Sequence, residues 1–517
     1  MSNKELKINQ LKLGAILSYV NSAVGTIIPM FYTPVMLRLM GQSEYGLFNL
    51  SKSVVGYLSL ISFGIGSAIV RYLTMYKAKD DKEGFENMFG MFNLIFRIIS
   101  GIALISGFIL AFCSKFIYAD SLGDQFGKFR LLIIILSINV ALTFAFTVYT
   151  TVVMVYEKFV FYQLMNILLT SVAPIVNIII LFVGFKSIGL TIVSLLISVL
   201  TTMCYIFFTT RRLKVKPKYN KLPKYLLPEI IKFSFWVFLA NIVSQLYSTT
   251  DKLIIGAVPE LATIGVAIYN IGDTFSHMIL QFTLGVSSVL TPKINTMVFQ
   301  GATKKNLTDV VIKFGRIQMY IVMILVTGFI AFGRPFIQLW AGDGYQEAFW
   351  VALVVMIPAC VPLVQGVALQ IIVAQNKHRF RSLVYLGIAV SNVIGTWLLV
   401  NSFGIIGAAI MTGFANIIGQ GLIMNWYYWK KIGLQIPRFW KSILNICIIP
   451  IIMCVVTLFI STLIDFYNPM FLISGIAIYT VIFVLGEWIF AMNDYEKDIF
   501  RSPVKKLIRK FSTKVKE

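Results

Sequence analysis

The sequence is short of charged residues. Only 13% of its 517 residues are charged, whereas 58% are hydrophobic. Soluble domains carry about 25% charged residues, so this chain has too little polar surface to coat several water-soluble cores. The composition therefore excludes a multidomain soluble protein and places the chain in a lipid bilayer.

Reactive and metal-binding patterns are also missing. The five cysteines lie in or beside apolar runs without metal-like spacing, so we expect small hydrophobic side chains rather than disulfides or a zinc site. No phosphate-cradling glycine loop, nucleophile elbow or metal-ligand cluster is found. We therefore expect no enzyme activity, no catalytic residues, no metal and no cofactor. The cysteines are Cys113, Cys204, Cys360, Cys447 and Cys454.

Long apolar runs are abundant. A helix of ~20 residues crosses a ~30 Å hydrocarbon core, and continuous runs of this length do not alternate as barrel strands must. The first run is too long for a signal peptide, so we count it as a span. The fourteen predicted spans are 13–36, 45–70, 88–112, 131–155, 159–183, 188–210, 233–257, 263–291, 310–333, 348–374, 383–401, 404–429, 442–464 and 470–491.

Basic residues predict the orientation of these spans. The net charge is +23, and in a soluble protein such a balance would indicate a nucleic-acid partner. Here nearly all basic residues between spans fall on the side of the two termini, which the positive-inside rule makes cytoplasmic. The charge is therefore a topology signal that also attracts anionic lipids, and we expect no nucleic-acid partner. The opposite side holds only Arg38, Lys115, Lys128, Arg130, Lys186 and Arg334.

An internal repeat relates two halves of the chain. GFILAFCSKFI at 107–117 matches GFIAFGRPFI at 328–337, and GLFN at 46–49 corresponds to GVAIYN at 265–270. Repeats of six spans share one orientation, which implies a pseudo-two-fold axis along the membrane normal and a cavity between the lobes.

We therefore predict an all-α integral membrane protein with 14 transmembrane helices, arranged as two six-helix lobes plus two extra C-terminal helices. The N-lobe is 1–210, a proline-containing cytoplasmic linker is 211–232, and the C-lobe is 233–429. The extra pair covers 430–491, and a basic cytoplasmic tail covers 492–517. That tail fits either an interfacial amphipathic helix, with Val504, Leu507, Ile508 and Phe511 on one face, or a disordered segment.

Ionisable residues within spans are candidate site residues, because burying a charge in hydrocarbon costs at least ~2.5 kcal/mol. The repeat alignment carries Lys52 onto Asp273, so these two could pair across the axis or line the cavity as separate charges. His277 lies one turn from Asp273 and forms either a proton-sensitive pair with it or a simple hydrogen bond. Asp251 and its neighbour Lys252 point about 100° apart on a helix, so at most one faces the cavity squarely.

Further candidates are weaker. Arg97 and Arg316 are repeat mates about two turns inside the cytoplasmic edge, where a long side chain either serves the cavity or snorkels to the headgroups. Uncharged polar residues extend the site or simply bond to neighbouring helices. They include Asn21, Asn49, Gln245 and Asn270.

The segment LMGQSEYGLFNL at 39–50, with FGIGSAIVRY at 63–72 and DKLIIG at 251–256, resembles bacterial polysaccharide export flippases of the Wzx type. These belong to the superfamily that also contains multidrug and toxin extruders and the lipid II flippase. The resemblance covers essentially the whole chain. It implies a carrier in the bacterial cytoplasmic membrane that moves an undecaprenyl-pyrophosphate-linked oligosaccharide outward by alternating access.

The resemblance also indicates site and partners. In related flippases spans 1, 2, 7 and 8 line the cavity, which favours Lys52 and Lys252 over Arg97 and Arg316. Expected partners are the lipid-linked glycan and membrane lipids, with a polysaccharide polymerase and glycosyltransferases as further candidates. Two alternatives stay open: a proton- or sodium-coupled drug or cation antiporter of the same fold, which needs a deep carboxylate such as Asp273, and a membrane glycan polymerase or ligase, which usually has a larger outer loop.

Overall fold

The computed structural model describes residues 3–375, 377–498 and 501, and every regular element in those residues is helical. The chain divides into two compact units. Unit 1 comprises Met1–Asn270 with Ala389–Ala408, and unit 2 comprises Ile271–Ile388 with Ala409–Glu517. Each unit is described by itself below.

Within these described residues, eleven helices are long and apolar enough to cross a membrane, and a bent pair makes a twelfth. The all-helical membrane architecture is thus confirmed, whereas fourteen spans and the two-fold symmetry stay predictions. The predicted eleventh and twelfth spans lie in one helical stretch, Arg379–Ile432, which Gly404 breaks with non-helical angles of φ 59° and ψ −145°. The predicted eighth span lies in the long helix α10 (Ala262–Phe299).

Unit 1 contains the helices of the first predicted lobe, α9, the first turns of α10 and part of α14. Its elements are α1 (Asn3–Met40), α2 (Gln42–Gly56), η1 (Tyr57–Ser62), α3 (Ile65–Ala78), α4 (Lys82–Cys113), α5 (Lys115–Leu122), η2 (Gly123–Gln125), α6 (Phe126–Val155), α7 (Phe159–Phe182), α8 (Lys186–Phe207), η3 (Phe208–Arg212), η4 (Lys224–Leu226) and α9 (Leu227–Ala257).

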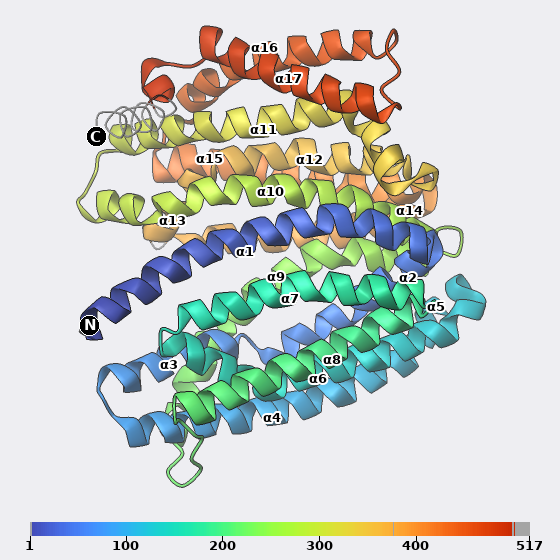
Figure 1. Ribbon diagram of the computed structural model, residues 1–517. Coiled ribbons are helices and arrows are strands. Elements are labelled where there is room, and N and C mark those ends of the chain that lie inside the picture. The colour runs from blue at the N-terminus through green and yellow to red at the C-terminus, as the bar shows by residue number, and fades with distance from the viewer. Residues whose placement is uncertain (1–2, 376, 499–500, 502–517) are drawn as a thin grey trace, which may run out of the picture. The chain divides into compact units, whose positions relative to one another are not determined.

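Aromatic packing holds the core of unit 1 together. Helix α4 packs against α6, and α6 packs against α8 (Figure 1). The interior face of α4 carries Phe85, Phe89, Phe92 and Phe96, all buried. The ring of Phe89 meets Tyr149 of α6 edge to face with centroids 5.1 Å apart, a favoured geometry for aromatic pairs.

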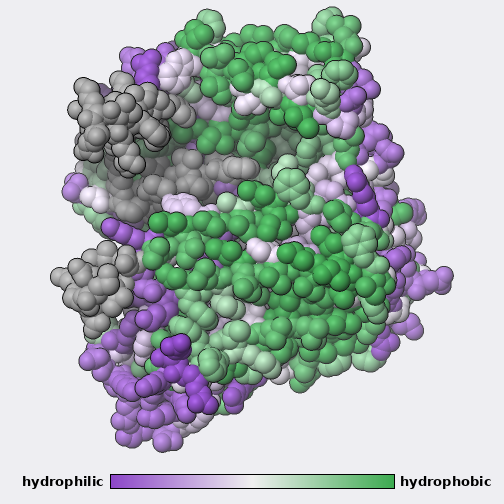
Figure 2. All heavy atoms as spheres, in the orientation of Figure 1, coloured by the Kyte–Doolittle hydropathy of each residue, from purple (hydrophilic) through white to green (hydrophobic). Residues whose placement is uncertain are grey.

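Apolar side chains also cover the outside of unit 1. Helices α1 and α7 pack together, and Figure 2 shows a broad hydrophobic surface over them. On α7 the exposed residues include Leu164, Leu168, Val172, Ile175 and Ile179, which recur at three- and four-residue steps. A continuous apolar stripe of this kind on an outer helix suits contact with lipid rather than water.

The segment that joins η3 to η4 lies on α4. The Lys218 backbone N–H donates to the Glu86 carbonyl at 2.9 Å, and the Lys218 ammonium pairs with the Glu86 carboxylate at 2.7 Å. The hydrogen bond from Lys218 to Glu86 raises the pKa of the ammonium above its usual value. A Cβ at Gly90 would lie 1.8 Å from the Lys218 carbonyl oxygen, so the close approach requires glycine.

Unit 2 holds the remainder of α10 and the helices that follow it. They are α11 (Lys304–Ala341), η5 (Asp343–Tyr345), α12 (Ala348–Val364), α13 (Gly366–Ala374), the ends of α14 (His378–Asn416), η6 (Ile417–Met424), α15 (Asn425–Tyr427), η7 (Tyr428–Ile432), α16 (Ile436–Ile460) and α17 (Pro469–Phe490).

The two C-terminal helices pack against α11. Phe332 of α11 contacts Phe466 and Tyr479 edge to face, and the Tyr479 hydroxyl donates to Thr327 at 2.7 Å. The predicted amphipathic face of Val504, Leu507, Ile508 and Phe511 lies outside the described residues.

Candidate functional site

Helices α2 and α9 of unit 1 pack side by side with opposite chain directions. Leu50 of α2 contacts Gly256 of α9, and one and a half turns further on Gly56 faces Gln245. The Tyr57 hydroxyl hydrogen-bonds with Thr250 at 2.8 Å. The predicted cationic residues of spans 2 and 7 therefore lie on neighbouring helices.

Lys52 and Lys252 project from these two helices. Their ammonium groups are close enough for the two charges to repel. The Lys52 side chain is exposed, and its ammonium lies 5.2 Å from the centroid of the Phe48 ring one turn earlier. Among the described residues of unit 1, no carboxylate pairs with Lys52. Two like charges held together in a membrane domain suit an anionic ligand, which would offset their repulsion.

Two predicted amides converge on one tyrosine. The Asn270 side chain donates to the Tyr45 hydroxyl at 2.7 Å, and the Asn49 side chain donates to the Tyr45 carbonyl at 2.9 Å. Asn49 and Asn270 are the repeat mates of the sequence alignment. The structure thus brings these two equivalent positions together around Tyr45, which the sequence did not single out.

Asp251 is buried, whereas its neighbour Lys252 is half-buried. Its carboxylate accepts hydrogen bonds from the Tyr269 hydroxyl at 2.5 Å and from the Thr396 hydroxyl at 3.0 Å. Thr396 also lies 2.9 Å from the Asn392 side-chain oxygen. A carboxylate that accepts several hydrogen bonds can stay ionised when buried. Asp251 is therefore an anchor between α9, α10 and α14 rather than an exposed lining residue.

The other polar candidates of unit 1 make local contacts. Gln245 donates to Thr249 at 3.1 Å one turn along α9. Asn21 of α1 is half-buried. Arg97 of α4 is exposed beside the exposed apolar residues Leu94 and Ile98, surroundings that suit a snorkelling side chain.

The candidates of unit 2 contact other residues of that unit. Asp273 and His277 lie one turn apart on α10 with a closest N–O distance of 3.5 Å. The guanidinium of Arg316 is occupied by Glu496 and by backbone carbonyls. The predicted pairing of Lys52 with Asp273 involves both units and stays a prediction.

A polar cluster lies at the N-terminal end of α2, which the topology prediction places outside the cell. Ser43 hydrogen-bonds with Thr263 at 2.9 Å and accepts from Gln125 at 2.8 Å. Glu44 pairs with Lys128 and accepts from Ser187 at 2.6 Å. We call Ser43, Glu44, Gln125, Lys128, Ser187 and Thr263 the polar clasp. It joins α2 to α6, α8 and the start of α10.

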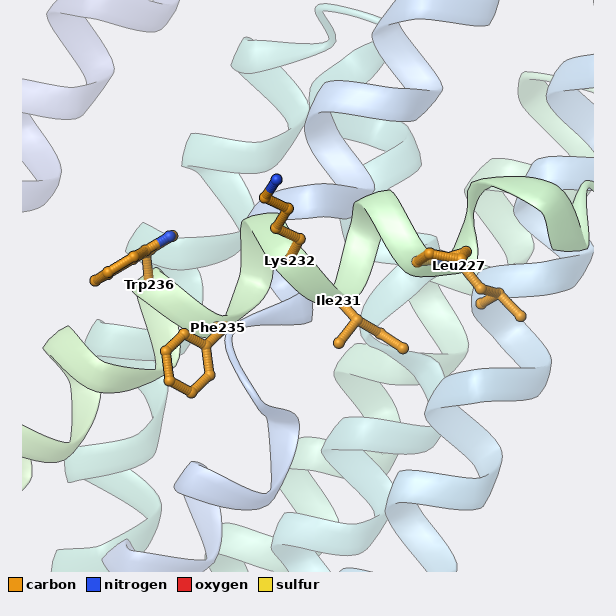
Figure 3. Close-up of a pocket in the computed structure, with 6 residues that line it drawn as sticks. Leu227, Ile231, Lys232, Phe235 and Trp236 are labelled. Carbon is orange, nitrogen blue, oxygen red and sulfur yellow. The ribbon is translucent and has the colours of Figure 1, made fainter.

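An apolar groove runs along the first turns of α9 (Figure 3). It is lined by Leu227, Ile231, Phe235 and Trp236, with Lys232 among them. Basic and aromatic side chains beside apolar ones are typical of the membrane interface, where an aliphatic chain and an anionic headgroup meet.

Sequence reasoning missed several residues of these clusters. Tyr45, Tyr269 and Thr396 lie in apolar runs, and an isolated hydroxyl there usually indicates ordinary helix packing. Glu496 lies beyond the last predicted span, so the search for charges within spans passed over it. Only the tertiary structure reveals that these residues bond to predicted ones.

Comparison with known proteins agrees with this architecture. A family model described as polysaccharide biosynthesis protein matches residues 12–298, more than half of the chain. No curated protein matches the sequence.

Solved structures share the fold at low sequence identity. The lipid II flippase MurJ in an inward closed conformation aligns over 95% of this chain and 99% of its own, with a TM-score of 0.69 and 17% identity. An inward-facing multidrug resistance transporter of the MATE family aligns over 81% of this chain and 99% of its own, with a TM-score of 0.60 and 15% identity.

An outward-facing MATE transporter aligns over 84% of this chain and 97% of its own, with a TM-score of 0.55 and 14% identity. The many apolar helices and these neighbours indicate a multi-pass membrane protein, and both family and fold are those of flippases and transporters rather than of catalytic enzymes. The chain belongs to the polysaccharide biosynthesis protein family.

Proposed function

We propose that the protein is a flippase that carries an undecaprenyl-pyrophosphate-linked oligosaccharide across the bacterial cytoplasmic membrane. The family membership and the likeness to a lipid II flippase support this class of substrate. The observation that carries the proposal is the placement of two lysines, Lys52 and Lys252, on the packed helices α2 and α9 of unit 1. Polysaccharide polymerases and glycosyltransferases are the partners that would use or supply such a substrate.

The chemistry of this substrate matches the side chains of unit 1. A pyrophosphate is anionic, and lysine binds phosphate as a compact point charge. The amides of Asn49, Asn270 and Gln245 supply hydrogen-bonding groups for sugar hydroxyls. The apolar groove at the start of α9, with Lys232 beside it, suits the polyprenyl chain and its headgroup at the membrane interface.

Translocation requires that the two ends of the site open in turn. The polar clasp and the close contact of Gly46 with Thr263 hold α2 against the start of α10. If both termini are cytoplasmic, as the basic residues predict, these contacts close the outer side. Opening toward the outside then requires the polar clasp to separate, and water can replace its hydrogen bonds at that level.

The test of this proposal is charge removal at the lysine pair. In Lys52→Ala and Lys252→Ala, transport of a pyrophosphate-linked oligosaccharide in proteoliposomes should fall at least about tenfold, because a desolvated anion loses a charge partner. Lys52→Arg should retain more activity than Lys52→Ala, since it keeps the charge. Surface polysaccharide and the amount of protein in the membrane are measured in parallel.

Lys115→Ala is the matched control, because it removes one exposed lysine of unit 1 from the start of α5, distant in sequence from the pair. It should transport as the unaltered protein does. Normal transport in both Lys52→Ala and Lys252→Ala would overturn the assignment of these lysines to the substrate anion.

A cation antiporter is the second candidate, favoured by the MATE likeness and by the half-buried carboxylate of Asp273 on α10. An antiporter should confer resistance to cationic drugs when overproduced, and Asp273→Asn should abolish that resistance. Unchanged drug sensitivity together with glycan transport would favour the flippase.

A further inference from the structure

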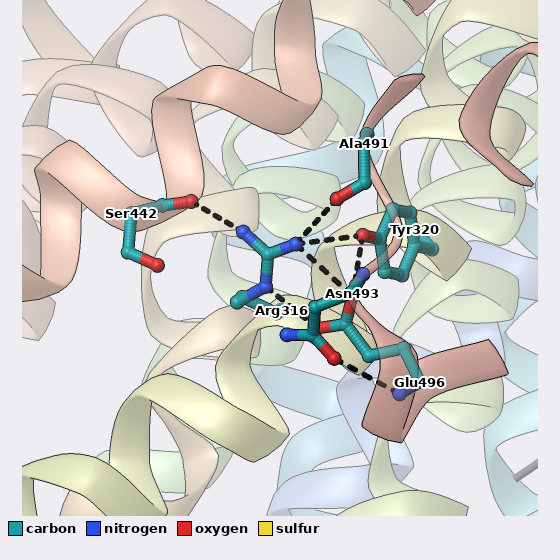
Figure 4. Close-up of polar contacts among 6 residues, drawn as sticks. All are labelled: Arg316, Tyr320, Ser442, Ala491, Asn493 and Glu496. Carbon is teal, nitrogen blue, oxygen red and sulfur yellow. Dashed lines mark hydrogen bonds and ion pairs between the residues drawn. The ribbon is translucent and has the colours of Figure 1, made fainter. Parts of the chain in front are cut away.

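Arg316 connects four segments of unit 2 (Figure 4). Its Nε donates to one carboxylate oxygen of Glu496 at 2.6 Å, and Nη2 donates to the other at 3.0 Å. Nη1 donates to the Ser442 carbonyl at 2.9 Å, and Nη2 donates to the Ala491 carbonyl at 2.7 Å. The guanidinium therefore ties α11 to α16, to the end of α17 and to the segment after it.

Glu496 lies in a short helical turn at 493–498 that is capped at its start. The Glu496 N–H donates to the Asn493 side chain, and the Asn493 N–H donates to the Glu496 carboxylate, both at 2.9 Å. This reciprocal pair is a capping box with asparagine at the N-cap. Burial opposes ionisation of Glu496, but the hydrogen bonds from Arg316, the Asn493 backbone and Tyr320, together with the charge of Arg316, outweigh it and hold the pKa of the carboxyl below its usual value. Glu496 thus neutralises Arg316.

A second carboxyl group, that of Glu487, lies one helical turn before Ala491, whose N–H donates to the Glu487 carbonyl at 3.0 Å and whose own carbonyl accepts from Arg316. Glu487 of α17 is fully buried at 0% exposure, and neither of its oxygens has a hydrogen-bond partner in the described residues. The groups that interact with it electrostatically are Arg316 and Tyr320 from α11, Cys447 from α16 and Glu496 from the turn. Only one of these is a cation.

The charge balance decides the state of Glu487. With Glu496 ionised, the charge of Arg316 is already compensated. An ionised Glu487 would leave the cluster with a net negative charge where water is excluded, and its oxygens would accept no hydrogen bond. With a proton on Glu487 the cluster is neutral. This arrangement of α17 is therefore the protonated one.

We propose that Glu487 is a proton-binding site and that loss of its proton releases the 493–498 turn from Arg316. When the proton passes to water, the carboxylate left on Glu487 competes with Glu496 for the same guanidinium. Glu496 then loses its bidentate partner, and the capping box that depends on its position loosens. The C-terminal helix pair thereby senses pH through one shared arginine. This inference does not depend on the transported substrate.

The first test compares the full-length protein with Glu487→Gln in lipid nanodiscs. The folded state binds a proton that an ordinary glutamate loses above about pH 4.3, so the stability of the unaltered protein should fall as pH rises. Glutamine cannot ionise. The thermal midpoint of Glu487→Gln should therefore exceed that of the unaltered protein by an amount that grows as pH rises and reaches at least about 2 °C at about pH 8.5. A difference that is the same at every pH would overturn the proposal.

The second test measures hydrogen exchange of the 493–498 amides, corrected for the intrinsic effect of pH. From about pH 6 to about pH 8.5, exchange in the unaltered protein should rise at least about threefold, while in Glu487→Gln it should stay slow. Glu496→Gln removes the carboxylate partner of Arg316. Its 493–498 amides therefore show how fast exchange is in the released turn at both pH values. An unaltered protein whose turn stays equally protected at both would contradict the coupling, even if Glu487→Gln failed to fold.

Discussion

Adjacent residues on α9 have different environments. Asp251 is buried and bonded to Tyr269 and Thr396, whereas Lys252 is half-buried and lies near Lys52. On a helix, neighbours point about 100° apart, so one of them can anchor the packing while the other serves a ligand. The DK pair at 251–252 therefore joins the structural role of Asp251 to the substrate-binding role proposed for Lys252.

The anchoring role of Asp251 makes a prediction. Asp251→Asn keeps the shape of the side chain but replaces two hydrogen bonds to a charged acceptor by weaker ones to a neutral amide. We expect a loss of about 1–3 kcal/mol in stability, because hydrogen bonds to charged groups contribute more than neutral ones. The thermal midpoint in detergent measures this effect.

Asp120→Asn is the control, since Asp120 is exposed at the end of α5. Its midpoint should stay within error of the unaltered protein. If the two variants unfolded at the same temperature, the hydrogen bonds from Tyr269 and Thr396 would contribute nothing measurable.

For single residues, the sequence predicts which positions are candidate polar residues better than it predicts which residues they contact. The sequence singled out Asn49 and Asn270, and both amides hydrogen-bond with Tyr45, whereas the equivalence of the two positions stays a prediction. The partner of Arg316 could not be predicted, because Glu496 follows it by 180 residues and belongs to no span. An ion pair between such distant positions depends on tertiary packing, which no local pattern encodes.

At the scale of the element, the close approach of α2 to the start of α10 depends on one glycine. A Cβ at Gly46 would lie 1.7 Å from the Thr263 carbonyl oxygen, far inside van der Waals contact. The oxygen is backbone, so neither helix can relieve the overlap by turning a side chain. The GLFN segment of the sequence is thus a packing motif.

Gly46→Ala should therefore force the two helices apart. In a cysteine-free background, a disulfide or short crosslink between Ser43→Cys and Thr263→Cys should form readily, because their hydroxyls lie 2.9 Å apart. Adding Gly46→Ala should reduce that crosslink several-fold and impair transport.

Gly101→Ala is the matched control, since nothing lies within 4 Å of a Cβ at that helical position. Gly101→Ala should leave the crosslink intact. Its only expected effect is a slight stabilisation of the helix, because alanine is more favourable than glycine inside a helix. Equal crosslinking with and without Gly46→Ala would show that α2 and α10 tolerate the methyl group.

Element boundaries were partly predictable. Apolar length predicted the positions of most helices, because a span must be long and apolar whatever its neighbours. The break at Gly404 coincides with the predicted boundary between the spans 383–401 and 404–429. The bend of span 2 was not predicted, since glycine occurs in many continuous membrane helices. Packing against neighbouring helices determines which glycine adopts a left-handed conformation.

At the scale of the whole molecule, the distribution of basic residues predicts which ends of the helices face the cytoplasm. The loop at 213–223 is rich in lysine and lies on α4 through Lys218. The loop between α16 and α17 contains Asp465 and no basic residue. The positive-inside rule therefore assigns these loops to opposite sides of the membrane.

Cysteine labelling tests this topology. In a cysteine-free background, Asp465→Cys should react with a membrane-impermeant thiol reagent on intact cells, since that side chain is exposed. Lys216→Cys, also exposed, should react only after the membrane is permeabilised. The reverse pattern would invert the orientation and place the polar clasp on the cytoplasmic side.

The bend in the second span has a consequence for motion. At Phe63 and Gly64 the backbone adopts φ of 48° and 70°, and the helical parts on either side differ in direction by 41°. A Cβ at Gly64 would lie 2.8 Å from backbone atoms of Ser234 and Phe238 on α9. The bend therefore packs directly against the main chain of α9. Because the bend at Phe63 and Gly64 is fixed against α9, the part of the span on one side can change its direction independently of the other. Helix α2, which carries Lys52, can therefore tilt while α3 keeps its position.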